Sequence, residues 1–231
     1  MKNESSTISR KNDQTSKDLT PVYNLAPEKN KTLWREFSSF NEDIKIKKIT
    51  DHFRQIMLIL GLNLDDESLK GTPHRVAKMY VKEMFSGLNP DNEPKITLFE
   101  NEYQYNEMLV EKNITLQSCC EHHFVPIVGK VHVAYFSSGK LIGLSKINRL
   151  VNYYSKRPQL QEKLTTQIAE ALKSALETND VAVVIDAAHM CLTTRGIHDI
   201  NSKTLTCHYS GKFKNEEVKK EFLNYIKSDQ G

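Results

Sequence analysis

The chain has 231 residues, of which 39% are hydrophobic and 26% are charged, and its formal net charge at pH 7 is +3. This balance is typical of a globular protein that binds no membrane, and it excludes a disordered chain. The charge is too small to predict nucleic-acid binding, so any anion site must come from local clustering of basic residues. No apolar run approaches the roughly 20 residues of a spanning helix, and the polar N-terminus resembles no secretory signal. Four unevenly spread cysteines make a poor disulfide framework, which favours a cytoplasmic setting.

The composition changes along the chain and predicts three regions. Residues 1–42 are rich in Lys, Asn, Ser, Asp and Thr and carry few periodic apolar positions. They predict a flexible tail, either a simple solubilising extension or a segment that docks onto a partner. Residues 43–100 are expected to form a helical region, and residues 101–231 a catalytic domain.

Two helices are expected before residue 100. From Ile49, apolar residues follow helical spacing, and Gly61 is suited to end that helix. The second helix is expected to start with Thr72 as N-cap and Pro73 in its first turn, and to stop at Gly87.

The rest of the chain predicts an α+β fold with the order strand, strand, helix, helix, strand, strand. Alternating or continuous apolar residues place the strands near residues 108–116, 131–135, 181–188 and 204–209. The two helices between them lie near residues 147–154 and 160–176, the second with a strong amphipathic stripe. We therefore expect an antiparallel sheet with two helices on one face. Four strands do not close a barrel, so the open edges predict pairing with other subunits.

Two short clusters carry the residues best suited to metal chemistry. Cys120, His122 and His123 form the first, and His189 and Cys191 form the second. Cys120, His123 and Cys191 would offer two thiolates and one imidazole, a zinc-type set that leaves a fourth position open. An extended backbone from His189 to Cys191 would put both side chains on one face. His122 and His189 would then lie beside the metal without holding it, which favours catalysis.

Two other interpretations of these clusters stay open at this point. A structural zinc site would recruit a fourth ligand from His122 or His189. A disulfide between Cys120 and Cys191 would exclude a metal, but it is disfavoured in a reducing compartment.

A basic cluster lies between the two halves of the metal set. Ser145 is a candidate N-cap of the helix that follows, and Lys146 and Arg149 share one face of it. A helix N-terminus with Lys and Arg suits a phosphate, and Arg195 could reach the same place. The alternative is a solvated basic face with no ligand.

Further candidates lie at two helix starts. Glu162 begins the long helix and suits the helix dipole, but its carboxylate could also accept two hydrogen bonds from a guanine edge, with the Gln161 amide reading the carbonyl. Arg75 is a weaker candidate for a phosphate contact.

Four separated motifs together resemble GTP cyclohydrolase I. They are Ser118-Cys119-Cys120-Glu121-His122-His123, Gly143-Leu144-Ser145-Lys146, Arg157-Pro158-Gln159-Leu160-Gln161-Glu162, and His189-Met190-Cys191 with Arg195-Gly196. The resemblance covers roughly residues 45–228, and the motifs occur in the family's order.

This resemblance implies the tunnelling fold, in which a β-β-α-α-β-β sheet with two helices on one face follows N-terminal helices. The sheets of several subunits then join into an oligomeric barrel, here a homodecamer with active sites between subunits. It implies one Zn²⁺ per subunit and the conversion of GTP and water to 7,8-dihydroneopterin triphosphate and formate. That reaction begins the synthesis of folate or of related pterins such as tetrahydrobiopterin.

The resemblance also assigns roles to residues of this chain. The implied zinc ligands are Cys120, His123 and Cys191. The implied proton-transfer residues are His122 and His189. The implied GTP contacts are Gln161 and Glu162 for the base, and Ser145, Lys146, Arg149, Arg195 and Arg75 for the triphosphate. Cys119 stands where the family resemblance predicts a non-thiol residue, and Cys207 is expected to pack on the last strand.

Two competing functions remain at this stage. The first is a zinc-stabilised assembly protein without turnover, which would not need His122 or His189. The second is a relative of the same fold, acting on a pterin or reducing a nitrile, that uses a cysteine nucleophile and works without zinc.

Overall fold

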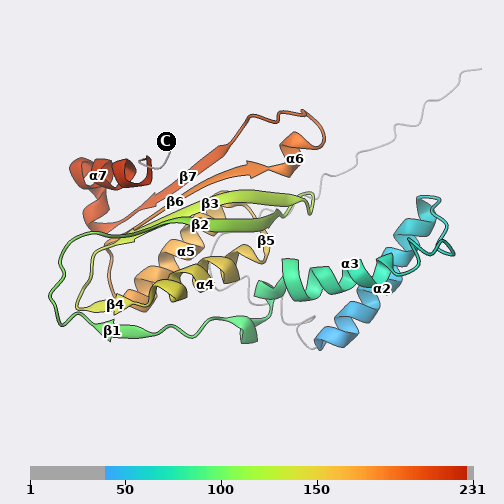
Figure 1. Ribbon diagram of the computed structural model, residues 1–231, viewed down its shortest axis with the longest axis horizontal. Helices are drawn as coiled ribbons and strands as arrows, with labels where there is room; N and C mark the ends of the chain where they lie inside the picture. The colour runs from blue at the N-terminus through green and yellow to red at the C-terminus, as the bar shows by residue number, and fades with distance from the viewer. Residues whose placement is uncertain (1–39, 228–231) are drawn as a thin grey trace, which may run out of the picture. The chain divides into compact units, whose positions relative to one another are not determined.

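The computed structural model describes residues 40–227 (Figure 1). Its first element is the helix α2 (Glu42–Ile59), which begins earlier than the predicted start near Ile49. The reason is an N-cap, because the side chain of Asn41 accepts a hydrogen bond of 2.9 Å from a main-chain amide of the first turn. Of the predicted tail, residues 1–39 lie outside the described part of the chain.

The C-terminal end of α2 follows the sequence prediction. Gly61 has a φ of +79°, a left-handed conformation that suits glycine. The amide of Leu62 donates to the carbonyl of Met57 at 3.1 Å, and the amide of Gly61 donates to that of Leu58 at 3.0 Å. This pair of bonds is the Schellman motif, which satisfies carbonyls that the helix itself leaves free.

The second helix, α3 (Thr72–Met79), differs from its prediction at both ends. Thr72 is the first helical residue and not the N-cap, because Gly71 occupies that position. After Met79 the chain does not continue as one helix to Gly87. It forms three short turns whose hydrogen-bond spacing differs from that of an α-helix. These are a π-helical turn η1 (Tyr80–Met84) and the 3-10 turns η2 (Ser86–Leu88) and η3 (Pro90–Asn92).

The main sheet contains the four predicted strands and one additional short strand. The strand order is β5-β2-β3-β6-β7, and all long pairings are antiparallel. The strands are β2 (Leu109–Cys120), β3 (Pro126–Tyr135), β5 (Pro158–Gln159), β6 (Val181–His189) and β7 (Thr204–Tyr209). The order of the long strands confirms two hairpins joined through β3 and β6.

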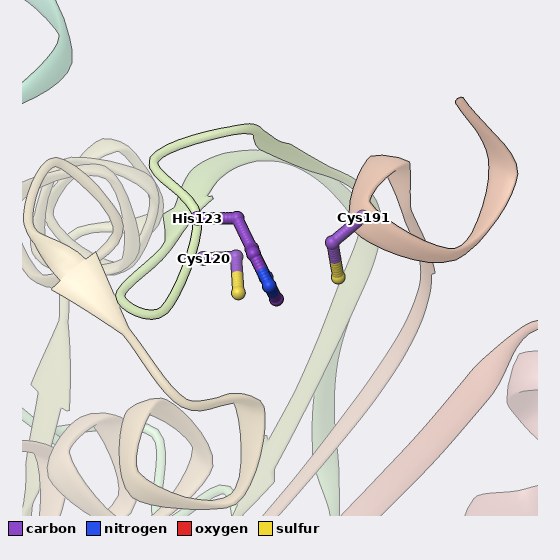
Figure 2. A group of neighbouring side chains, drawn as sticks. All are labelled: Cys120, His123 and Cys191. Atoms are coloured by element: carbon purple, nitrogen blue, oxygen red, sulfur yellow. The ribbon is translucent and has the colours of Figure 1, made fainter. Parts of the chain in front are cut away.

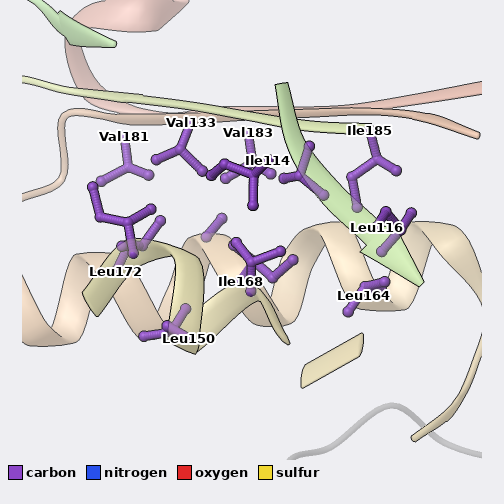
Figure 3. Close-up of a cluster of buried hydrophobic side chains, with 14 of the residues drawn as sticks. Ile114, Leu116, Val133, Leu150, Leu164, Ile168, Leu172, Val181, Val183 and Ile185 are labelled. Atoms are coloured by element: carbon purple, nitrogen blue, oxygen red, sulfur yellow. The ribbon is translucent and has the colours of Figure 1, made fainter. Parts of the chain in front are cut away.

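Two helices, α4 (Leu144–Ser155) and α5 (Gln161–Leu176), cover one face of this sheet, as predicted (Figure 1). The apolar stripe of α5 is fully buried against the strands, and Figure 3 shows Leu164, Ile168 and Leu172 facing Val183 and Ile185 across this layer. Burial of this stripe is the main apolar contribution that fixes α5, at about 1.5–3 kcal/mol for each large side chain.

The final helix, α7 (Glu216–Lys227), lies on the opposite face of the sheet (Figure 1). Its Phe222 is completely buried in a second apolar cluster with Phe213, Ala182 and Val184. The central strand β6 is therefore covered on both faces. This explains why its sequence is a continuous apolar run without alternation.

Several short elements have no counterpart in the sequence prediction. β1 (Leu98–Glu100) and β4 (Lys140–Ile142) form a separate two-stranded ribbon. The one-turn helix α6 (Met190–Thr193) follows β6 directly, and a 3-10 turn η4 (Gly211–Lys214) precedes α7. Because β1 pairs with β4, the predicted boundary at residue 100 does not separate two compact units, and the described residues belong to one. Among the described helices, none has the length and apolar character needed to cross a membrane.

Candidate active site

Cys120, His123 and Cys191 converge at one end of the sheet. Cys120 is the last residue of β2, His123 lies in the loop that follows, and Cys191 lies in α6 (Figure 2). One ligand atom from each of the three lies within 4.8 Å of the others. The prediction of an extended backbone through Cys191 was wrong, because β6 ends at His189 and the chain turns into α6.

The loop after β2 is held in shape by its own backbone. The amide of Cys120 donates to the carbonyl of Val125 at 2.8 Å, and the amide of Phe124 donates back to the carbonyl of Cys120 at 2.9 Å. Phe124 adopts a left-handed φ of +55°, a conformation that costs a non-glycine residue free energy. Its ring packs against Phe85 with the centroids 5.2 Å apart, which holds the turn in place. The two histidines of the loop are exposed as a result.

The loop is also tied to the start of α5. The amide of Glu121 donates to the carbonyl of Gln159 at 3.0 Å. The Glu121 carboxylate lies 3.7 Å from the ammonium of Lys163, which is in the first turn of α5. Gln159 itself belongs to β5, which pairs in parallel with Cys119 and Cys120.

The three ligand residues fit a zinc ion. Two thiols and an imidazole are donors that favour zinc over magnesium or calcium. Ligand atoms at about 2.3 Å from one tetrahedral ion lie about 4 Å apart, close to the 4.8 Å limit seen here. Burial is the largest cause that raises the pKa of Cys191, and the neighbouring Cys120 raises it further. A divalent cation would reverse this effect, because it stabilises both thiolates.

Of the two predicted proton-transfer histidines, His122 contacts this group, and His189 lies two residues before Cys191 in the chain. His122 is exposed, and its Nδ1 lies 4.0 Å from the sulfur of Cys120. His189 ends β6, and its Nε2 lies 2.7 Å from the Oε1 of Gln161. Burial lowers the pKa of His189, and the nearby Glu162 carboxylate opposes that shift.

Arg195 contacts the group of Cys120, His123 and Cys191, and not the basic cluster that the sequence analysis expects it to join. It follows α6 and is exposed, and its guanidinium nitrogen lies 2.9 Å from the Nε2 of His123. Glu162 lies in the first turn of α5 with an exposed side chain. A cation therefore lies beside His123, and a carboxylate lies near His189.

The basic cluster on α4 lies elsewhere in the same chain. Ser145 is inside the helix and is not the N-cap, which is Gly143. Asn148, which lies between Lys146 and Arg149, donates to the Glu111 carboxylate at 3.1 Å.

Glu111 is near the start of β2, whereas Cys120 is its last residue. At about 3.3 Å per residue, the strand separates these two positions by roughly 25–30 Å. One chain therefore does not bring Ser145, Lys146 and Arg149 to the thiols.

Arg75 likewise bonds within its own region. Its guanidinium donates to the carbonyl of Ser68 and to the hydroxyl of Thr72, each at 2.9 Å. These contacts hold the loop before α3 against that helix. Within residues 40–227 the Arg75 side chain makes only these two hydrogen bonds, and neither connects it to the group of Cys120, His123 and Cys191.

Gln161 does not present its amide to the surface. The side chain is only 1% exposed. Its amide nitrogen donates to the carbonyls of Ile185 and Thr204 and to the hydroxyl of Thr206, and its oxygen meets His189. The expected reading of a guanine carbonyl by this amide is therefore not available in this conformation.

Sequence reasoning missed the residues that support the site. Gln159 and Lys163 hold the loop after β2, and Phe124 fixes its turn. The sequence signal for Gln159 is its place in the motif Arg157-Pro158-Gln159-Leu160-Gln161-Glu162, which does not indicate a strand. Nothing in the sequence indicates that two residues suffice for a parallel pairing next to Cys120.

Comparison with known proteins agrees with the motifs. The family model for GTP cyclohydrolase I matches residues 49–227. A protein of Flavobacterium johnsoniae named GTP cyclohydrolase 1 is 58% identical over 188 residues, which cover 81% of this chain and 84% of that protein. Proteins of the same name from Serratia proteamaculans and Vibrio parahaemolyticus are each 50% identical and cover 83% and 82% of this chain, and 87% and 88% of their own lengths. The chain belongs to the GTP cyclohydrolase I family.

Proposed function

We propose that this chain is a zinc-dependent hydrolase that converts GTP and water to 7,8-dihydroneopterin triphosphate and formate. The observation that carries the proposal is the meeting of Cys120, His123 and Cys191 with two histidines that such a site does not need as ligands. Zinc, when bound, supplies Lewis-acid activation of water at neutral pH. The reaction would serve the first step of folate or related pterin synthesis.

The residues around the thiols suit the separate tasks of this reaction. The Glu162 carboxylate is exposed and accepts hydrogen bonds, so it can hold the two donor groups of a guanine edge. His122 and His189 can give protons to the imidazole ring of the base as it opens, and take them back. Arg195 offers a cation for the triphosphate on the same side.

The position of the basic cluster supports active sites between subunits. Ser145, Lys146 and Arg149 lie roughly 25–30 Å along β2 from the thiols, a distance that one GTP molecule does not bridge. If both sets serve one site, they come from different copies of the chain. Arg75, on α3, is a further candidate for contribution from a neighbouring copy.

The sheet offers a route to such an assembly. In the part of the chain that the structure describes, β7 pairs on one side only, and β2 is flanked by β5 only at its last residues. Joining these edges between copies would remove them from solvent. We therefore propose the tunnelling fold, with the sheets forming an oligomeric barrel, and a homodecamer that contains one zinc ion per subunit. Because the site needs reduced thiols, we place it in the cytoplasm.

The test is incubation of the reduced, zinc-loaded protein with GTP, with formate and pterin absorbance measured together. We expect both to appear in equal amounts. His122→Ala should lower the rate at least about 100-fold, because general acid–base catalysis contributes about that much or more. Its zinc content should stay unchanged. His52→Ala, which removes an exposed histidine on α2, is the matched control and should keep full activity.

Three results would contradict the proposal. Full activity of His122→Ala would exclude the proton-transfer role of this histidine. No turnover of GTP by a zinc-loaded wild-type protein would favour a zinc-stabilised assembly protein. Turnover that persists after complete removal of zinc would favour a cysteine nucleophile instead.

A further inference from the structure

We infer that Gln161 is a positioning residue that fixes the protonated nitrogen of His189, so that this histidine exchanges protons with the substrate through Nδ1. The inference rests on the proposed function, because it assumes that His189 acts on a bound substrate. It assigns Gln161 a different task from the recognition of guanine.

The orientation of the Gln161 amide is fixed by its surroundings. The nitrogen end lies 3.1 Å from the carbonyl of Ile185 and 2.8 Å from the carbonyl of Thr204. Carbonyl oxygens only accept hydrogen bonds, so the opposite orientation would press the amide oxygen against two acceptors. The nitrogen end must therefore face β6 and β7, and the oxygen end must face His189.

The orientation of the amide then decides the tautomer of His189. The Oε1 of Gln161 lies 2.7 Å from the Nε2 of His189 and can only accept. Nε2 must carry a proton, so in the neutral ring Nδ1 holds the lone pair. Within residues 40–227, Nδ1 forms no hydrogen bond with another protein group. It is the nitrogen left to take a proton from a substrate or to return it.

Two threonines hold the amide in this position. The Gln161 nitrogen donates to the Thr206 hydroxyl at 3.1 Å, and that hydroxyl lies 2.7 Å from the hydroxyl of Thr165. Thr165 in turn donates to the main-chain carbonyl of Gln161 at 2.7 Å. Because the Thr165 hydroxyl already donates to that carbonyl, the Thr206 hydroxyl must donate to Thr165, and the three residues form a closed ring of hydrogen bonds. The ring joins α5 to β7 beside the end of β6, which makes the amide a rigid support.

The first test is a spectroscopic measurement of the His189 tautomer. Protein labelled with ¹⁵N-histidine is compared with the same protein carrying His189→Ala, so that the His189 signals are assigned by difference. We expect Nε2 to be protonated in the wild type. Gln161→Met, which keeps the approximate volume but removes both ends of the amide, should give a mixture of tautomers. A wild type with the proton on Nδ1, or a Gln161→Met spectrum identical to the wild type, would overturn the inference.

The second test separates positioning from substrate recognition. For Gln161→Met we expect kcat to fall about 10- to 100-fold, the range seen when a supporting hydrogen bond of a functional histidine is removed, with KM changed less than about threefold. A large rise in KM with kcat preserved would show instead that the amide binds the base.

Controls separate this inference from the proposed function and from misfolding. Gln167→Met makes the same substitution on α5, where Gln167 contacts Gln159 and not His189, and it should keep the wild-type kcat and tautomer. Thr206→Val removes one acceptor but leaves the two carbonyls that orient the amide, so it should also keep the tautomer. Thermal melting and zinc content of each variant report on the fold. If the wild type does not act on GTP, the proposed function fails while the tautomer result still stands.

Discussion

Neighbouring cysteines at the end of β2 lie in different surroundings. Cys120 belongs to the apolar core and to the metal-type group, whereas Cys119 points to the other face of the strand and is 1% exposed. Burial, with a smaller contribution from the adjacent Cys120, raises the pKa of Cys119 to about 11. The thiolate is the reactive form of cysteine. Cys119 is therefore a packed side chain with little of the reactive thiolate.

This environment predicts a slow reaction of Cys119 with alkylating agents. At pH 8 a thiol with a pKa of about 11 is ionised in roughly one molecule in a thousand, and burial blocks access as well. We expect iodoacetamide to leave Cys119 unmodified in the folded protein and to modify it fully in urea, as measured by peptide mass spectrometry. Cys119→Ser identifies the peptide. Rapid modification in the folded state would contradict the burial described here.

The candidate site could be predicted from the sequence to the extent that it depends on residue type and spacing. Cys120, His123 and Cys191 were predicted as one group, and the structure brings them within 4.8 Å. The burial of Gln161 was not predicted, because its partners are main-chain carbonyls on two strands. A sequence shows no main-chain acceptors, so the role of that amide appears only when α5 is placed on the sheet.

At the scale of elements, the turn η2 is packed directly against the end of α4. The amide of Gly87 donates to the carbonyl of Lys156 at 2.9 Å, and its carbonyl accepts from the Nε of Arg157 at 2.8 Å. The Arg157 guanidinium lies 4.5 Å from the ring centroid of Tyr153 and 4.6 Å from that of Tyr154. Gly87 thus joins the helical region to the sheet domain by close contact, and does not act as the helix stop that its sequence suggested.

Gly87→Ala should destabilise the protein. A Cβ at this position would lie 2.0 Å from the main-chain oxygen of Tyr153, which cannot move without shifting α4. We expect a loss of about 1–3 kcal/mol in the free energy of unfolding, the usual cost of overpacking, measured by urea denaturation. Gly143→Ala is the matched control, because its Cβ would meet Phe99 at an ordinary 3.5 Å. Equal stability of the two variants would refute the close packing of η2 on α4.

Long elements were predictable because periodic burial marks them in the sequence. The stripe of α5 and the apolar run of β6 are both confirmed. The strands β1, β4 and β5 have only two or three residues each, too few for a period to appear. The π-helical turn after α3 was missed for a related reason. Its residues are ordinary helix formers, and it is accompanied by a tertiary contact, the Tyr80–Phe124 ring pair, that the sequence does not reveal.

At the scale of the whole molecule, the two halves of the predicted GTP site lie at opposite ends of β2. The thiols, His122 and His189 are at one end, and the basic cluster of Ser145, Lys146 and Arg149 is at the other. A chain with this arrangement has two incomplete sites. Assembly through the open sheet edges would allow each copy to supply its basic cluster to the thiols of another.

Mixed assemblies of two inactive variants test this arrangement. Lys146→Ala and Cys191→Ser should each lose activity when assembled alone, the first through weaker triphosphate binding and the second through loss of zinc. When the two are co-expressed in equal amounts with different tags and purified together, a quarter of the sites should contain both intact halves, so activity should return to about 25% of the wild type. The mixture of Lys146→Ala with Arg149→Ala is the control, because both changes damage the same half and no intact site can form. If the thiols and the basic cluster of one chain served the same site, neither mixture would recover activity. Formate release distinguishes these outcomes when it is measured at a GTP concentration well below the KM of Lys146→Ala, where the binding defect is expressed.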